Sequence, residues 1–397
     1  MSYKKYKRVF LIVMDSLGIG ATNDAIKYDD EGTNTFLHIS QKCNGLYIPN
    51  LNKLGLYDLD NALEGVNKVS HPHSIVCKGE EASIGKDTMT GHFEMMGIYT
   101  TKPFKTFTDT GFPKELIDEL SLKTGKKFIG NCSASGTEII KLLGEQQTKE
   151  GSLIIYTSAD SVLQLAANVD KMELKELYRC CEIARELCLK EEWKVGRVIA
   201  RPYIGTSPDN FKRTSDRHDY ALSPEGRTYM DILKDNNYMV SCIGKISDIF
   251  NNQGVVKTQK TISNDDGMKK TIDETALDFE GLCFVNLVEF DSEFGHRRNP
   301  LGYGKAIEEF DVKLKELINK LNDDDLLIIT ADHGNDPTHK GTDHTREMVP
   351  MIFYSKSITD GKLIDNRKSF ADIGRSIIYN FNLEKEDQIG EVINELF

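Results

Sequence analysis

The stretch DLLIITADHGNDPTHKGTDHTRE, Asp325 to Glu347, begins as an apolar run and continues into a loop crowded with histidines and aspartates. An apolar run without polar alternation predicts a strand that is covered on both faces of a parallel sheet. Two further runs end in the same way, because VFLIVM stops at Asp15 and LCFVNLVEF stops at Asp291. The sequence therefore predicts three parallel strands that each lead to an aspartate at the carboxyl end.

Helical patterns lie between these strands. Apolar residues recur at helical spacing over 306–321, and again over 370–381 after the strand-like segment VPMIFY. Such alternation of strands and helices predicts an α/β fold with a doubly wound, mostly parallel sheet. A chain of 397 residues has room for this core and for one insertion.

The middle of the chain, residues 104–222, has a different character, because it contains none of the candidate metal ligands. It has its own apolar helix face over 174–188 and its own strand candidates at 152–157 and 197–202. We therefore expect a metal-binding core formed by residues 1–103 and 223–397, with a smaller inserted α+β domain at 104–222. The loop-rich segment 204–217 is predicted as the hinge that returns the chain to the core.

The charge balance limits the partners. Fifty basic and 62 acidic residues give a net charge of −12, which argues against nucleic-acid binding and against a basic membrane face. An anionic substrate would therefore need a locally basic pocket. The apolar run Val9 to Met14 is too short for a signal peptide, and no run approaches the length of a membrane span. Eight cysteines without C-x-x-C spacing fit a reducing, cytoplasmic setting.

The aspartates can converge although they lie far apart in the sequence, because ligands gather at the carboxyl ends of the strands in an open α/β sheet. A histidine follows each of the last two aspartates, and another ends the loop. The candidate metal ligands are Asp15, Asp291, His296, Asp332, His333 and His344. This mixed nitrogen and oxygen set suits two divalent ions, such as manganese or zinc.

Two ions carry four positive charges and three carboxylates remove three, so the site would be slightly positive before a substrate enters. Such a pair of ions can stabilise the attacking and leaving oxygens of a phosphoryl transfer. An ordinary cap or loop role could explain any one of these residues, but not the joint pattern. His92 and His218 border segments with expected functions, and neither receives a role from the sequence.

Phosphoryl transfer through an enzyme intermediate needs a nucleophile, and SIGKDTMTGHFEMMG, Ser83 to Gly97, offers Thr88 and Thr90. Both would lie near the start of a helix, whose first N–H groups can bind a phosphate on threonine. The spacing does not choose between them, and a threonine there can also simply cap the helix. A P-loop is excluded because GEEASIGKD is one residue too long and has Asp where Ser or Thr is required.

The motifs together resemble one enzyme family. With Asp15, the segments DTMTGH, DSEFGHRR, RHDYAL, TADHGND and GTDHTRE are similar to those of the phosphopentomutases in the alkaline phosphatase superfamily. The resemblance covers nearly the whole chain, including the insertion. It implies an alkaline-phosphatase-like core with the insertion as a cap domain. It also implies interconversion of ribose 1-phosphate and ribose 5-phosphate, and of the 2-deoxyribose pair.

The resemblance assigns roles that spacing alone does not. Thr88 rather than Thr90 corresponds to the phosphorylated threonine, which would exchange its phosphate through a sugar bisphosphate. One manganese would be held by Asp15, Asp332 and His333, and the other by Asp291, His296 and His344. The implied substrate contacts are Ser158, Asp160, Val162, Arg197, Arg213 and Lys245, with Arg201 as an alternative to Arg197. Glucose 1,6-bisphosphate is implied as an activator, and we expect a monomer that acts on small pentose phosphates.

Other functions would use the same metal core. A cofactor-independent phosphoglycerate mutase or a phosphatase would share the ligands and differ in the cap. A metal-binding module without chemistry would keep the ligands and lack a phosphorylated threonine. A sulfatase is disfavoured because no C-x-P-x-R segment surrounds any of the cysteines.

Overall fold

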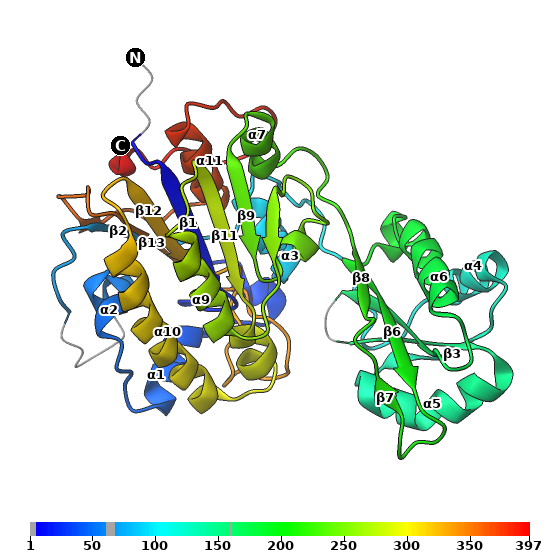
Figure 1. Ribbon diagram of the computed structural model, residues 1–397. Coiled ribbons are helices and arrows are strands. Elements are labelled where there is room, and N and C mark those ends of the chain that lie inside the picture. The colour runs from blue at the N-terminus through cyan, green and yellow to red at the C-terminus, as the bar shows by residue number, and fades with distance from the viewer. Residues whose placement is uncertain (1–4, 61–67, 159–160) are drawn as a thin grey trace. The chain divides into compact units, whose positions relative to one another are not determined.

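The computed structural model describes residues 5–60, 68–158 and 161–397. The chain divides into two compact units, residues 1–103 with 224–397, and residues 104–223. We call them the core unit and the inserted unit. Each contains one β-sheet with helices packed against it (Figure 1).

The sheet of the core unit has the strand order β10-β9-β11-β1-β12-β13-β2-β14. The strands from β10 to β12 are parallel, and β13 is antiparallel to both of its neighbours. Their bounds are β1 (Arg8–Met14), β2 (Ser74–Gly79), β9 (Met239–Ile243), β10 (Lys257–Gln259), β11 (Gly281–Leu287), β12 (Asp325–Thr330), β13 (Val349–Tyr354) and β14 (Lys362–Leu363). The three apolar runs thus become the adjacent central strands β11, β1 and β12, in which every residue is buried.

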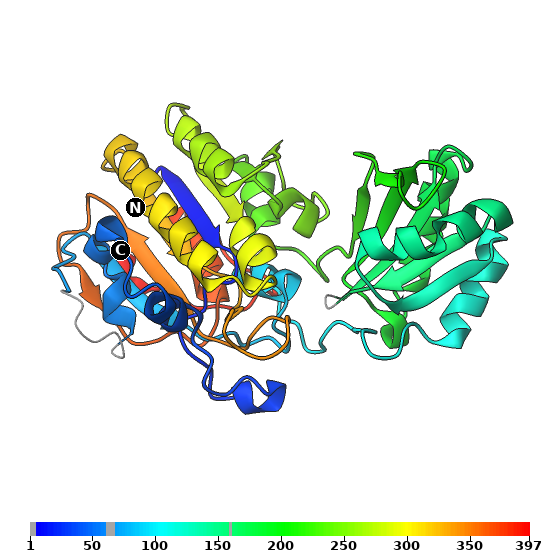
Figure 2. The ribbon, with the colours of Figure 1, turned by 90° about the horizontal axis from the view of Figure 1, so that it is seen from below.

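Helices cover this sheet on both faces. Figures 1 and 2 show α9 and α10 on one face and α11 on the other. The helices of the core unit are η1 (Ala25–Tyr28), α1 (Thr35–Lys42), α2 (Pro49–Lys53), η2 (Leu56–Leu59), α3 (Thr88–Met95), α7 (Tyr229–Asp235), α8 (Ile246–Ile249), α9 (Asn264–Glu274), η4 (Phe290–Gly295), α10 (Pro300–Lys320), α11 (Ala371–Asn380) and η5 (Asn394–Leu396). The two helical patterns read from the sequence correspond to α10 and α11.

The run LCFVNLVEF differs from its prediction. Strand β11 ends at Leu287, and the last residues of the run enter η4, which is a π-helical turn. Asp291 therefore lies within this turn rather than directly at the end of a strand. The pattern could not mark this boundary, because Phe290 after the strand is also buried and a short apolar run does not distinguish a strand from a buried helical turn.

The inserted unit has a second mixed sheet with the order β3-β4-β5-β6-β7, and β8 also pairs with β6. Its strands are β3 (Phe128–Ser133), β4 (Leu153–Thr157), β5 (Val162–Asn168), β6 (Arg197–Ile204), β7 (Lys212–Arg213) and β8 (His218–Ala221). Its helices are α4 (Lys114–Thr124), α5 (Gly136–Glu150), α6 (Leu174–Leu187) and η3 (Glu191–Trp193). One apolar cluster includes residues of α4 and α6, and a second includes residues of α5.

The segment 204–217 is not a hinge. It lies inside the inserted unit, where β7 pairs with β6 in antiparallel register. The eight cysteines are unpaired, and six of them are buried. Within the described parts of the chain, none of the helices has the length and apolar character that crossing a membrane requires.

Candidate metal and phosphoryl-transfer site

The three aspartates of the core unit lie at the same edge of its sheet. Asp15 directly follows β1, Asp332 lies two residues beyond β12, and Asp291 is in η4. All three are buried, with exposed fractions of 1%, 0% and 6%. The sheet therefore brings together three carboxylates that are separated by up to 317 positions, because its central strands are adjacent and parallel.

The three histidines share one hydrogen-bonding pattern. In each of them the Nδ1 atom lies near a backbone carbonyl oxygen. The distance is 2.7 Å from His296 to the oxygen of Thr342, 3.0 Å from His333 to that of Gly334, and 3.0 Å from His344 to that of Lys86. A carbonyl oxygen only accepts, so each Nδ1 carries the proton and donates. In the neutral ring the Nε2 atom then keeps its lone pair, which is the form that binds a metal.

These Nε2 atoms face the carboxylates in two overlapping clusters. In one, Nε2 of His333 lies 3.6 Å from Oδ1 of Asp15 and 3.3 Å from Oδ2 of Asp332. In the other, Oδ2 of Asp291 lies 3.0 Å from Nε2 of His296 and 3.6 Å from Nε2 of His344. These two groups contain the residues that the resemblance assigned to the two ions.

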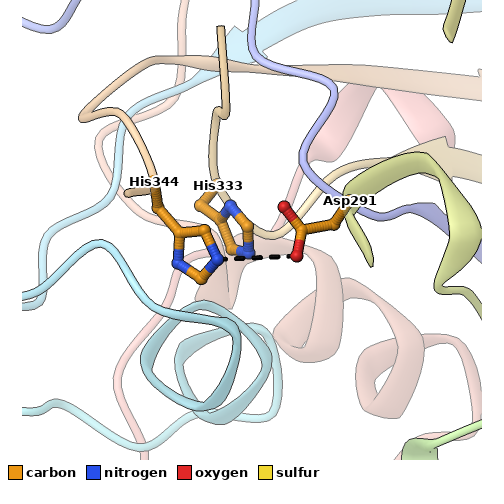
Figure 3. Close-up of side chains that lie close together, drawn as sticks. All are labelled: Asp291, His333 and His344. Atoms are coloured by element: carbon orange, nitrogen blue, oxygen red, sulfur yellow. Dashed lines mark ion pairs between the residues drawn. The ribbon is translucent and has the colours of Figure 1, made fainter. Parts of the chain in front are cut away.

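The clusters are in contact with each other. The rings of His333 and His344 stack with their centroids 3.9 Å apart, and Figure 3 shows Asp291 facing both rings. Ligand atoms of Asp291, His333 and His344 all lie within 4.8 Å of one another. His333 is therefore placed to bind at either position.

The donor atoms have the chemistry of a divalent metal centre. Oδ1 of Asp15 and Oδ2 of Asp332 are buried without a hydrogen-bond partner. Burial, reinforced by the charges of Asp332 and Asp291, raises the pKa of Asp15 well above its usual range. The Nε2 atoms of His296 and His344 are 3.1 Å apart, and in the neutral rings neither has a proton to share. Cations would relieve each of these unfavourable arrangements, so these residues fit divalent metal ions.

Thr88 is the threonine next to the metal ligands. It is the first residue of α3, and its Oγ1 lies 3.2 Å from Nε2 of His333. Thr90 is fully buried, and its hydroxyl donates to Oδ2 of Asp87 at 2.6 Å. Asp87 is the N-cap of the helix and also accepts from the backbone N–H groups of Met89 and Thr90. The hydroxyl of Thr90 is thus used in the cap, whereas that of Thr88 faces the ligands.

Gly91 lets α3 approach the metal loop. A Cβ atom at this position would lie 2.0 Å from the carbonyl oxygen of Asp332, which is backbone and cannot move aside cheaply. Only glycine allows two backbone segments to come this close. This contact holds the helix that carries Thr88 against the loop that carries Asp332 and His333.

Three residues that support the ligands were not predicted from the sequence. Nδ1 of His92 lies 3.2 Å from Oδ2 of Asp332, Asn286 donates to Oδ2 of Asp15 at 2.8 Å, and Asn335 donates to Oδ1 of Asp291 at 2.7 Å. Asn286 could have been noticed as the only amide within an otherwise apolar buried strand. No local pattern marks the other two, because their roles depend on contacts between distant segments.

The GTDHTRE loop is held by buried charges. Oε1 of Glu347 accepts from the hydroxyls of Thr35 and Thr345 at 2.7 and 2.6 Å, and Oε2 accepts from the N–H of Thr35 at 2.9 Å. Arg346 pairs with Glu81 at 2.5 Å and with Asp24 at 3.1 Å. These contacts position His344, which lies just before them in the chain.

The predicted substrate contacts lie in both units. Ser158, Val162, Arg197 and Arg213 belong to the inserted unit, and Lys245 is the N-cap residue of α8 in the core unit. Asp160 lies outside the described residues. Arg197 has Asp219 at 3.8 Å, whereas Arg201 donates through Nε to Gln164 at 2.9 Å.

Comparison with known proteins identifies the family of the chain. A model of the Metalloenzyme superfamily matches residues 7–385. The chain is 57% identical to a phosphopentomutase of Clostridium perfringens and 56% identical to one of Clostridium tetani, with 99% of each chain covered in both cases. The chain belongs to the phosphopentomutase family.

Among solved structures, a protein from Pyrococcus horikoshii superposes with a TM-score of 0.49 at 14% identity, over 97% of this chain and all of that one. The family match confirms the resemblance and the fold class that were read from the motifs. The members of this family are mutases, and the chain is accordingly a phosphotransferase-type enzyme with a divalent metal site.

Proposed function

We propose that the enzyme interconverts ribose 1-phosphate and ribose 5-phosphate, and the corresponding 2-deoxyribose phosphates, through a phosphothreonine at Thr88. The observation that carries this proposal is the 3.2 Å distance between Oγ1 of Thr88 and Nε2 of His333. This distance supports a role for the Thr88 hydroxyl as nucleophile, since the hydroxyl lies at the start of a helix and beside the candidate metal ligands. A phosphate on this oxygen would also lie at the positive end of the helix dipole.

The reaction conserves all atoms without a further reactant. The bond from phosphorus to Oγ1 of Thr88 breaks as a new bond forms between phosphorus and the free hydroxyl oxygen of the sugar phosphate. The proton of that hydroxyl passes to Oγ1, which becomes the threonine hydroxyl. The resulting sugar bisphosphate reorients, and its other phosphate returns to Thr88. A bisphosphate such as glucose 1,6-bisphosphate would prime an unphosphorylated enzyme by the second half of this sequence.

The proposed cofactors are two manganese ions, held by Asp15, Asp332 and His333 and by Asp291, His296 and His344. When bound, they would supply positive charge that lowers the pKa of the Thr88 hydroxyl and stabilises the oxygens of the phosphate during transfer. We propose that the inserted unit recognises the sugar phosphate and excludes water, since water would hydrolyse the phosphothreonine. We further propose that the enzyme is a cytoplasmic monomer.

The test follows ribose 1-phosphate with manganese and a trace of glucose 1,6-bisphosphate. Samples are quenched, freed of the paramagnetic metal and analysed by phosphorus NMR. We expect conversion to ribose 5-phosphate with little inorganic phosphate. Release of inorganic phosphate would instead indicate a phosphatase, and turnover of phosphoglycerates alone would indicate a mutase for another substrate.

Two variants assign the nucleophile. Thr88→Ala should lose transfer and the added mass of one phosphoryl group, while its metal content stays at the wild-type level. Thr90→Val keeps the shape of the side chain and removes only the hydroxyl in the cap, so it should still be phosphorylated. An active Thr88→Ala protein would place the nucleophile elsewhere.

A further inference from the structure

Arg298 follows the turn η4, and its side chain connects this turn to the loop that precedes His344. Its guanidinium lies within hydrogen-bonding distance of four backbone carbonyl oxygens and one amide oxygen. These oxygens belong to Gly295, Asn335, Asp336, Gly341 and Asp343, at 3.0, 2.5, 3.2, 2.5 and 3.1 Å. In the described part of the chain, no carboxylate forms an ion pair with Arg298. This arginine therefore joins segments of the chain rather than balancing a negative charge.

Arg298 and His296 together hold three successive carbonyl groups. Nδ1 of His296 lies 2.7 Å from the middle one, that of Thr342. Nε and Nη2 of Arg298 donate to the carbonyls on either side of it. The next residue is His344, whose Nε2 lies 3.1 Å from Nε2 of His296. The same three contacts thus bring two of the candidate metal ligands together.

A third ligand is reached through Asn335. Its Oδ1 accepts from Nη1 of Arg298 at 2.5 Å, and its Nδ2 donates to Oδ1 of Asp291 at 2.7 Å. The guanidinium only donates, so the amide oxygen must face Arg298, and the amide nitrogen is then left for Asp291. Arg298 therefore contacts the supports of Asp291, His296 and His344, two of which Figure 3 shows side by side.

The other metal position has a different support. Asp15 follows β1 and Asp332 lies just beyond β12, and these two strands pair directly in the sheet. Asp291 lies in the turn η4, and His344 lies in the loop between β12 and β13. The sheet holds the first pair in place, whereas the second pair needs contacts between turn and loop. Arg298 supplies such contacts.

The backbone of Arg298 points to the same role. Its φ angle is +51°, in the left-handed region that disfavours residues with a Cβ atom. Such a conformation persists where the surrounding contacts compensate for it, and here the guanidinium makes them. Charge cannot be the reason for an arginine at this place, because a cation repels nearby divalent ions.

We propose that Arg298 is the positioning residue that assembles the metal position formed by Asp291, His296 and His344. It acts by fixing the loop and the amide that hold these three ligands, and it need not contact the ion or the substrate. The assignment to one position of two rests on the pair of ions in the proposed function.

The test measures the manganese affinity of the full chain by competition with a fluorescent chelator, without substrate or turnover. Arg298→Lys keeps the charge, but a single ammonium group cannot span the five oxygens. It should weaken one ion by about 10- to 100-fold. Arg298→Gln should weaken the same ion, although loss of a positive charge alone would strengthen it. Wild-type affinities in both variants would overturn the proposal.

The matched control is the neighbouring arginine. Arg297 is exposed and pairs with Glu293 at 2.9 Å. Arg297→Gln removes the same charge from the same turn, and it should bind manganese at least as tightly as the wild type. A loss equal to that of Arg298→Gln would overturn the special role of Arg298.

Two background variants identify the position that is affected. Asp15→Asn and Asp291→Asn each remove a ligand of one position. Arg298→Lys should weaken the remaining ion in the Asp15→Asn protein and should have no effect in the Asp291→Asn protein. Equal effects in the two backgrounds would overturn the assignment.

The outcomes separate this inference from the proposed function. Near-ultraviolet circular dichroism of the chelated proteins shows whether each variant folds. If the Arg298 variants do not fold, Asn335→Ala breaks the link to Asp291 instead, and a wild-type affinity there would overturn the proposal. A wild type that binds one ion would contradict the proposed pair, and the effect of Arg298→Lys on that ion would still decide its role. If pentose phosphates are interconverted while the Arg298 variants keep both affinities, the function stands and this inference fails.

Discussion

The Nδ1 atom of His92 lies 2.8 Å from the carbonyl oxygen of Thr88 and 3.2 Å from Oδ2 of Asp332. This ring nitrogen thus lies between the helix that carries Thr88 and a carboxylate of the metal site. The ring is fully buried and packs against Phe284 at 5.8 Å. We therefore expect His92 to position Asp332.

We predict that His92→Phe weakens metal binding. Phenylalanine fills the same space but lacks the ring nitrogen that lies 3.2 Å from Asp332, and loss of such supporting contacts typically costs about 10- to 100-fold in metal affinity. The affinity is measured by competition with a fluorescent chelator, which does not depend on turnover. His218→Phe, in the inserted unit, should leave the affinity unchanged. A wild-type affinity in His92→Phe would mean that Asp332 is held without this contact.

Gly91→Ala should destabilise the protein and reduce phosphorylation of Thr88. The added methyl group collides with the backbone of Asp332, and overpacking of this kind costs about 1–3 kcal/mol. Denaturant unfolding gives the free energy, and intact mass gives the phosphorylated fraction. Gly267→Ala is the control, since its methyl group meets side-chain atoms rather than backbone: the end of the Leu287 side chain at 2.8 Å and Thr261 at 3.7 Å. Equal losses of stability and of phosphorylation in the two variants would show that Gly91 has no special role.

The buried carboxyl of Glu347 should make stability depend on pH. Burial raises its pKa from 4.5 to about 7. Between these values the folded chain keeps a proton that the unfolded chain releases, so its contribution to stability falls as the pH rises from about 4.5 to about 7. The slope is at most about 1.4 kcal/mol per pH unit.

Glu347→Gln removes this titration. Its stability relative to the wild type should therefore improve as the pH rises through the same window, even if the variant is less stable overall. Urea unfolding of the chelated protein at pH 5, 6 and 7 measures the difference. The control variant Glu145→Gln changes an exposed residue, and its stability should vary with pH as that of the wild type does. A difference between Glu347→Gln and wild type that is constant with pH would contradict the raised pKa.

Removal of divalent metal should lower the thermal midpoint. The carboxylates and the facing Nε2 atoms then lose the cation that offsets their burial, and a ligand at a hundredfold excess over its Kd contributes about 2.7 kcal/mol per site. Thermal unfolding with manganese and with chelator measures the effect. Asp291→Asn should reduce the response to manganese, whereas the exposed Asp209→Asn should keep it. An unchanged midpoint on chelation would argue against a metal at these residues.

Much of the fold could be predicted because it follows from local pattern. The runs that became β1, β11 and β12 are apolar throughout, since strands between two helix layers have no exposed face. Their termination in aspartates pointed to the edge of the sheet where Asp15 and Asp332 now lie. The sequence could not predict that β11 ends early and that Asp291 lies in a π-helical turn, because a short apolar run does not distinguish a strand from a buried helical turn.

The sequence by itself determined the candidate ligands, the two candidate threonines and the family, since these depend on residue types at short spacings. Only the tertiary structure decided which groups act together. It placed Thr88 rather than Thr90 against His333, and it brought His92 to Asp332 from a segment 240 residues away. It also distinguished Arg201, which donates to Gln164, from Arg197, which lies 3.8 Å from Asp219. The physical reason is that a hydrogen bond or an ion pair depends on distances across the sheet, and no spacing along the chain records those distances.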